Sequence, residues 1–234
     1  MNTLFLALFR PVKAFSKLKT EAFSAFSWVI VLLLMLVNLI LNIPVGEKIL
    51  QITVSEMSLT QYQLDTMAQV AYKMRYLQIA GTLILYIIMF LCYALLLNLL
   101  VYLAKAKDKL FYKKALQLLV CCYLIVTIGD LVNTTFIYIR GLDAINSLYE
   151  ISLTGLNLLT SVEQIGAVGY SFLSYINPFQ LWFVVLLSVG LGIFTDMKRM
   201  KTIIISVLFW LITIMIPVLF VYFSQATLAK TGVM

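Results

Sequence analysis

Five long apolar stretches, separated by polar or charged segments, dominate the pattern of the chain. They cover residues 22–43, 77–103, 115–139, 178–194 and 202–223. Each is close to the ~20 residues that a helix needs to cross a hydrocarbon core of ~30 Å. Because lipid offers no partners for backbone N–H and C=O groups, each crossing must be helical. The pattern predicts an all-α, polytopic membrane helix bundle of about five transmembrane helices, a single integral membrane domain over residues 1–234.

The first twenty residues have a two-sided pattern. On a helical wheel the large apolar side chains gather on one side as Leu4, Phe5, Leu8, Val12 and Phe15, and the cations Arg10, Lys13 and Lys17 gather on the other. A helix of this kind lies in the plane of the lipid headgroups with its cations in water. We therefore expect an N-terminal interfacial helix over residues 1–20.

Two connections, each of about 30 to 40 residues, separate the first crossing from the second and the third from the fourth. Apolar residues recur in them at helical spacing: Met57, Leu64, Met67 and Ala71, and then Leu159, Val162 and Ile165. This spacing predicts amphipathic helices in the two outer connections. The other two connections are short, so the crossings that they join should form antiparallel hairpins.

Composition supports a membrane protein. Of the 234 residues, 63% are hydrophobic and 12% are charged, whereas a soluble domain has roughly half apolar and a quarter charged residues. The net charge of +7 comes from short basic groups between apolar stretches. We interpret these groups as facing anionic lipid, and we expect no nucleic-acid partner.

The basic residues also predict an orientation. Twelve of the seventeen lie in the N-terminal segment and the two short connections. They are Arg10, Lys13, Lys17, Lys19, Lys105, Lys107, Lys109, Lys113, Lys114, Lys198, Arg199 and Lys201. Cytosolic loops of membrane proteins carry an excess of Lys and Arg. We therefore expect a cytosolic N-terminus, a cytosolic basic face and, after five crossings, a C-terminus outside.

The residues needed for common catalytic sites are missing from the sequence. The chain has no histidine, which excludes His-activated nucleophiles and H-E-x-x-H zinc sites. It contains neither a Gly-rich phosphate loop nor a GxSxG motif. Cys92, Cys121 and Cys122 lie inside apolar stretches and are expected to be buried small hydrophobes. We expect no enzyme activity, no cofactor and no metal site.

Asp130 is the ionisable residue that lies well inside a predicted crossing. It precedes Arg140 by ten residues, or about 15 Å of helix. An acid inside a membrane suggests a proton or cation site. The alternative is a structural role, either by hydrogen bonding across helices to Asn38, Asn42 or Asn98, or in a wet outer vestibule.

Small residues form a stripe in the fourth crossing, at Ser188, Gly190 and Gly192. Such a stripe allows helices to approach closely, either within the chain or with a partner protein. Pro217 interrupts the fifth crossing and is expected to kink it. Neither feature is a catalytic signature.

Four segments together resemble a known family. They are RPVKAFSKLK before the first crossing, AKAKDKLFYKKAL between the second and third, NPFQLWFVVLLSVGLGIF in the fourth, and the turn KRMK. This arrangement resembles the YIP family of Ypt/Rab-interacting membrane proteins in its bacterial form. The resemblance implies five helices, a cytosolic N-terminus, an outward C-terminus and a scaffold or trafficking role without enzyme activity.

The chain also departs from the family pattern. Eukaryotic members carry a long polar cytosolic N-terminal region and a DLYGP motif, and neither is present in this sequence. Binding to Rab-type GTPases is therefore not carried over, and we expect a bacterial cytoplasmic membrane. No catalytic or ligand residue is carried over either.

Two functional hypotheses follow. In the first, the chain is a non-enzymatic accessory or scaffold protein in contact with membrane lipid and with another integral membrane protein or itself, such as part of a transport or export system. The Ser188–Gly192 stripe and the basic cytosolic face are its expected contact surfaces. In the second, it is a small permease or channel with Asp130 as the ion or proton site.

Overall fold

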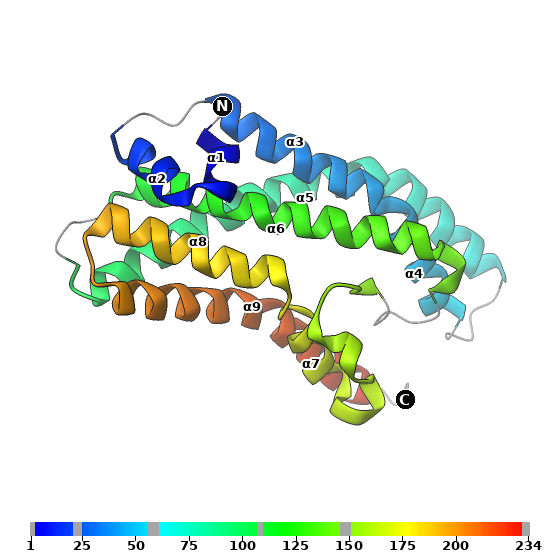
Figure 1. Ribbon diagram of the computed structural model, residues 1–234. Helices are drawn as coiled ribbons and strands as arrows, with labels where there is room; N and C mark the ends of the chain where they lie inside the picture. Colours follow the sequence, from blue (N-terminus) through cyan, green and yellow to red (C-terminus); the bar gives the residue numbers. More distant parts are fainter. Residues whose placement is uncertain (1–2, 21–24, 56–60, 107–109, 146–150, 231–234) are drawn as a thin grey trace.

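The computed structural model describes residues 3–20, 25–55, 61–106, 110–145 and 151–230 (Figure 1). Within these ranges every regular element is a helix. Five helical segments there are long and apolar enough to cross a membrane: Ser27–Ile52, Ile79–Leu103, Tyr112–Arg140, Pro178–Thr195 and Arg199–Phe223. The predicted all-α fold with about five transmembrane helices is confirmed.

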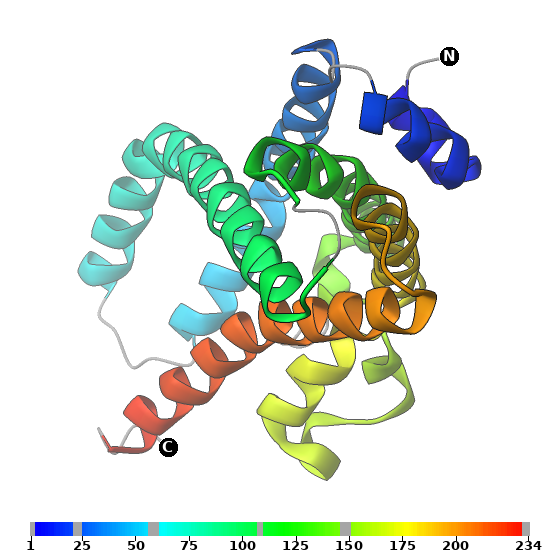
Figure 2. The ribbon, with the colours of Figure 1, turned by 90° about the vertical axis from the view of Figure 1, so that its left-hand side faces the viewer.

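Helix α6 (Tyr112–Arg140) is the centre of the bundle. It packs against α3 (Ala25–Leu41), α5 (Gln61–Leu103) and α8 (Pro178–Thr195), and α8 packs in turn against α9 (Arg199–Lys230). Helices α3 and α5 pack mainly on other helices and have few contacts with each other. Figure 2 shows them as separate ribbons at the periphery. The spans thus form a packed α6–α8–α9 core with two more peripheral helices.

The first crossing continues past the expected stop at Pro44. Helix α3 ends at Leu41, and α4 (Ile43–Ser55) begins almost at once. Proline is tolerated in the first turn of a helix, where its missing N–H has no partner in any case. Pro44 therefore starts a second helix instead of ending the first.

The two connections predicted to be amphipathic are largely helical. The first supplies α4 and the start of α5, although Met57 and the side chains of Leu64, Met67 and Ala71 lie outside what the structure describes. The second supplies the short turns η1 (Leu142–Ala144) and η3 (Leu156–Leu159) and the helix α7 (Val162–Ser174). Helix α7 packs against α9.

The predicted N-terminal interfacial helix is two short helices, α1 (Thr3–Phe9) and α2 (Pro11–Thr20). They pack against α6 and α8 respectively. Of the apolar side chains predicted to face lipid, Leu4, Leu8 and Phe15 are buried in these contacts, whereas Phe5 and Val12 are exposed. Much of the apolar side therefore covers one end of the bundle.

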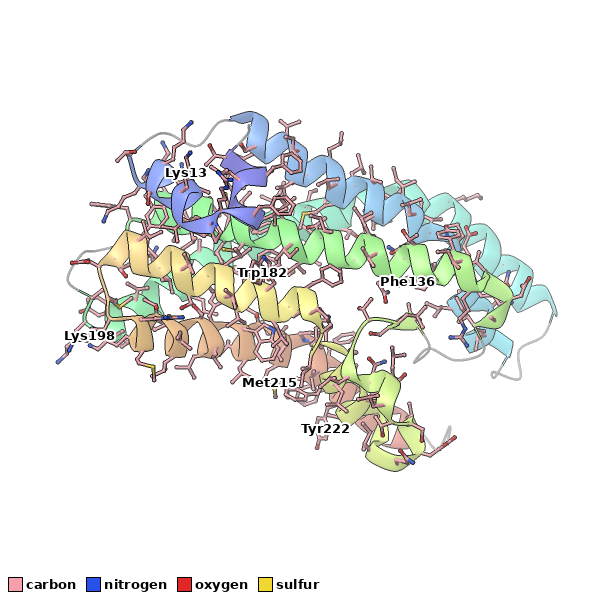
Figure 3. All side chains as sticks on the ribbon, viewed as in Figure 1. Lys13, Phe136, Trp182, Lys198, Met215 and Tyr222 are labelled. Carbon is pink, nitrogen blue, oxygen red and sulfur yellow. The ribbon has the colours of Figure 1, made fainter. Side chains whose placement is uncertain are left out.

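The basic segments gather at that same end, which we call the basic end. Lys13 and Lys198 both lie there (Figure 3). Lys114 Nζ donates a hydrogen bond to the Leu18 carbonyl at 2.5 Å, and Lys201 Nζ donates one to the Ala104 carbonyl at 3.4 Å. Cations near helix C-termini satisfy carbonyl groups that have no partner within the helix. At the opposite end, the far end, Lys48 and Asp143 form an ion pair at 3.3 Å.

Candidate functional site

Asp130 lies on α6 at the level where α8 begins. Its position is eighteen residues after Tyr112, the first residue of α6, or about 27 Å along the helix. Its neighbour Gly129 faces Phe179 in the first turn of α8. The candidate span on α6 covers the whole helix, Tyr112–Arg140, so Asp130 lies inside a span, as expected from the sequence. The ten residues from Asp130 to Arg140 continue α6 past the level at which α8 begins.

The NPF sequence sets the start of α8. Asn177 caps the helix, because its side-chain oxygen accepts a hydrogen bond from the Gln180 backbone N–H at 2.9 Å. Pro178 occupies the first turn, where a missing N–H costs nothing. Phe179 then lies directly against Gly129. The motif that carries the family resemblance thus places the beginning of α8 beside Asp130.

A polar cavity of about 160 Å³ lies beside the contact between Phe179 and Gly129. We call it the polar cavity. It is lined by Val126, Gly129, Asp130, Asn133, Ser152, Thr154, Ser174, Tyr175, Asn177, Phe179 and Gln180. Most of these side chains carry hydrogen-bonding groups. Such a lining suits water.

Asn133 builds one wall of the polar cavity. Its side chain donates to the Ile151 carbonyl at 2.9 Å and accepts from the Leu153 N–H at 2.7 Å. The Asn133 amide therefore satisfies one backbone carbonyl and one backbone N–H of the irregular segment at residues 151–153. The fully buried Asn157 holds the same segment by donating to the Ser152 carbonyl at 3.0 Å.

Tyr175, three residues before the start of α8, also lines the polar cavity. Burial raises the pKa of its hydroxyl above the ordinary value of 10.0, and the negative charge of Asp130 raises it further. The phenol is therefore neutral near pH 7 and remains able to donate a hydrogen bond toward the cavity.

A second cavity, the aromatic cavity, lies between α3, α5 and α6 and measures about 60 Å³. It is lined by Met35, Asn38, Tyr86, Met89, Phe90, Tyr93, Tyr123, Val126, Thr127 and Asp130. Its rings contact one another, with centroids 5.0 Å apart for Phe90 and Tyr123 and 6.0 Å apart for Tyr93 and Tyr123. Asp130 lines both cavities and stands where they approach each other.

The Asp130 carboxylate is exposed to these cavities. Among the described residues it forms no hydrogen bond and no ion pair. The asparagines expected to bind it instead join Thr134: Asn42 Nδ2 donates to Asn38 Oδ1 and to Thr134 Oγ1, both at 3.0 Å. Thr134 Oγ1 bonds the Asp130 backbone carbonyl at 2.9 Å. The polar contact between α3 and α6 therefore leaves the carboxylate free.

Asn98 lies apart from this group. It lines a third cavity, of about 550 Å³, near the basic end, together with Lys105 and apolar residues of α5. The structure therefore brings Asn38 to the Asp130 site, places Asn42 next to Asn38, and leaves Asn98 elsewhere.

The small-residue stripe is used inside the chain. Gly190 is buried against Leu118 of α6, so closely that a Cβ would overlap the leucine side chain. Ser188 Oγ lies 3.2 Å from Thr202 Oγ1 of α9, and Gly192 faces the same threonine. The stripe thus seats α8 between α6 and α9.

Sequence reasoning missed the aromatic wall. It assigned no role to these rings, although Tyr93 is buried and contacts Tyr123 in the interior. It also missed Asn133 and Tyr175 of the polar cavity. The signal for Asn133 was its spacing of three residues from Asp130, which places both on one face of a helix.

Comparisons with known proteins agree with the fold. No curated protein and no solved structure matches the chain. A family model described as the Yip1 domain matches residues 5–220, which includes all five spans and the NPF start of α8. The chain therefore belongs to the Yip1 domain family.

Proposed function

We propose that this integral membrane protein is a non-enzymatic accessory protein that associates with another membrane protein. The proposal rests on the packing between Asp130 and the basic end. There, α6 carries an unbroken run of fully buried apolar side chains, Leu118, Leu119, Val120, Cys121 and Cys122, with Leu124 two residues further on. Leu186, Leu187 and Leu191 of α8 pack in the same core. A core filled in this way favours a protein that acts through its surface.

The peripheral helix α3 supplies the surface that we assign to this contact. Val29, Leu33, Val37 and Ile40 are all exposed and follow one another at spacings of three or four residues. They therefore form one apolar stripe along α3, which we call the α3 stripe. Helix packing in membranes depends on close van der Waals fit, so a bulky residue in this stripe should disturb an interface there.

The orientation belongs to the same proposal. We place the basic end in the cytosol, because Lys and Arg are retained on the cytosolic side of membrane proteins. Helix α1 then lies on the cytosolic side, and α9, which runs away from the basic end (Figure 1), ends outside. Labelling single cysteines introduced at Lys13 and at Asp143 with a membrane-impermeant reagent in intact cells tests this. Reaction is expected only at position 143.

The test of association is affinity purification of the tagged protein from native membranes in mild detergent. We expect another membrane protein to be recovered in stoichiometric amount with the parent chain. Val37→Trp, in the α3 stripe, should lower that recovery. Leu208→Trp places the same bulk on an exposed position of α9 and should leave it unchanged. Recovery of the chain alone contradicts the accessory role.

A second candidate function is an ion or proton site at Asp130. The observation in its favour is that the carboxylate lines both the polar and the aromatic cavity. This function predicts proton- or cation-linked flux in proteoliposomes that Asp130→Asn abolishes and Asp143→Asn does not. Absence of flux with the parent protein eliminates it.

A further inference from the structure

The aromatic cavity has the chemistry of a site for an organic cation. Tyr86, Phe90, Tyr93 and Tyr123 supply ring faces or edges, and Asp130 supplies the carboxylate. The negative faces of aromatic rings attract ammonium and guanidinium groups. A carboxylate in an apolar surrounding is stabilised by an opposite charge. No lysine or arginine lines this cavity in the described part of the chain, so its complement has to come from another molecule.

The helices around the aromatic cavity limit which cationic molecules can reach it. The cavity is bounded by Met35 of α3, by Met89 of α5 and by α6, and α3 and α5 have few contacts with each other. A ligand that enters between these two helices therefore has to pass methionine and other apolar side chains.

A basic side chain fits better than a lipid headgroup. The ammonium of a zwitterionic phospholipid is accompanied by a phosphate, and the cavity lining supplies no cation for that phosphate while Asp130 would repel it. A lysine instead joins its ammonium to an apolar stem, and arginine similarly combines a cation with methylene groups. Both leave no anion behind, and both are used to pair acids within membranes.

We propose that the aromatic cavity receives a lysine or arginine side chain from a transmembrane segment of the partner protein, which pairs with Asp130 against the rings that line the cavity. This inference rests on the proposed accessory function and names the chemistry of its contact. It places the recognition inside the spans of α3, α5 and α6, at the level where α8 begins.

The chemistry of the site is tested first with a simple probe. Dodecylammonium carries the proposed cation on an apolar stem, and dodecanol has the same stem without the charge. Native mass spectrometry in a non-ionic detergent should show dodecylammonium, but not dodecanol, bound to the parent chain. Binding should weaken roughly tenfold or more in Asp130→Asn and stay unchanged in Asp143→Asn, which removes a carboxylate at the exposed turn η1. Equal binding to all three proteins contradicts a cation site.

The partner is tested by photo-crosslinking from position 89, on the α5 wall of the cavity, in native membranes. A photoreactive amino acid at Met89 should capture a transmembrane segment that contains a lysine or arginine, identified by mass spectrometry of the crosslinked peptide. Asp130→Asn should reduce this capture and Asp130→Glu, which keeps the charge, should restore it. The glutamate variant also separates loss of charge from loss of folding.

The outcomes distinguish this inference from the function on which it rests. Equal capture by the parent and Asp130→Asn, or capture of a segment without a basic residue, refutes the charge pair and leaves the accessory role standing. Capture of lipid alone, together with affinity purification of the chain alone, refutes both.

Discussion

Replacement of Gly129 by alanine tests whether α8 is seated directly on the backbone of α6. A Cβ at this position would lie 2.6 Å from Cγ and 2.7 Å from Cβ of Phe179. Carbon atoms in contact prefer about 3.5–4.0 Å, so the overlap is about 1 Å. Because Cβ of Phe179 is fixed to the α8 backbone, rotation of the ring cannot remove the overlap. The first turn of α8 has to move.

Two opposing effects set the change in the free energy of unfolding for Gly129→Ala. Overpacking of this kind costs about 1–3 kcal/mol, whereas alanine is favoured over glycine in a helix by about 1 kcal/mol. Gly81→Ala provides the matched control, since Gly81 is also helical and nothing lies within 4 Å of its added Cβ. Both variants share the helix preference, so their difference isolates the overlap. We expect Gly129→Ala to be less stable than Gly81→Ala by about 1–3 kcal/mol.

The assay is reversible unfolding of each purified variant in mixed micelles with increasing SDS, followed by circular dichroism. Amide hydrogen exchange adds a local measurement, and it should be faster in the first turn of α8 for Gly129→Ala alone. Equal unfolding free energies for the two variants, with unchanged exchange in α8, would falsify the seating of Phe179 on Gly129.

Three further predictions concern neighbouring contacts. Gly190→Ala brings a Cβ onto the Leu118 side chain, so it should cost about 1–3 kcal/mol, and a thermodynamic cycle with Leu118→Ala should show that the smaller side chain relieves part of this loss. Asn133→Ala removes both hydrogen bonds to the segment that follows η1, and hydrogen exchange should rise at residues 151–153 and not in α9. The raised pKa of Tyr175 means that its neutral form contributes stability that is fully present below pH 10.0 and lost as pH rises through the folded pKa. The absorbance titration of the parent minus that of Tyr175→Phe should therefore show an ionisation above pH 10.0, and Asp130→Asn should move it downward.

Much of the architecture could be predicted from the sequence, because whether a segment can cross a bilayer depends on its length and apolar character along the chain. A run of about 20 apolar residues has to be helical and has to cross. The fourth crossing, for example, was expected at residues 178–194 and is observed at Pro178–Thr195. Clustering of the cations at one end of the bundle was also visible as the order of basic segments along the chain.

The packing of these helices could not be predicted in the same way. In a soluble helix the polar residues mark the outer face, but in a membrane both the buried and the lipid-facing residues are apolar. Leu118 is fully buried on α6 and Leu95 is 60% exposed on α5, although they are the same residue type within equally apolar sequence. The aromatic cavity depends on this distinction, so the sequence does not identify the tyrosines that line it.

Polar residues inside the spans were partly informative. Hydrogen bonding of Asp130 to Asn38, Asn42 or Asn98 was one alternative from the sequence. Asn38 and Asn42 do lie at the α3–α6 contact, but Thr134 is their partner on α6. The sequence identifies which groups need partners in an apolar medium. It does not decide between candidates one helical turn apart, here Asp130 and Thr134, because both lie on the same face of α6.

The NPF sequence connects the family resemblance to the candidate site by a physical route. Asn177 ends the irregular segment and caps α8, and Phe179 locks that first turn against Gly129. Asp130 faces the polar cavity because α8 begins beside it. If α8 began earlier in the chain, its first turn would cover that cavity. Asn177→Ala removes the cap, which is typically worth about 1 kcal/mol, and should fray this turn and widen the opening beside Asp130. Faster hydrogen exchange at Gln180, with weaker dodecylammonium binding, would connect the motif to the site, whereas unchanged exchange would show that the cap does not hold the turn.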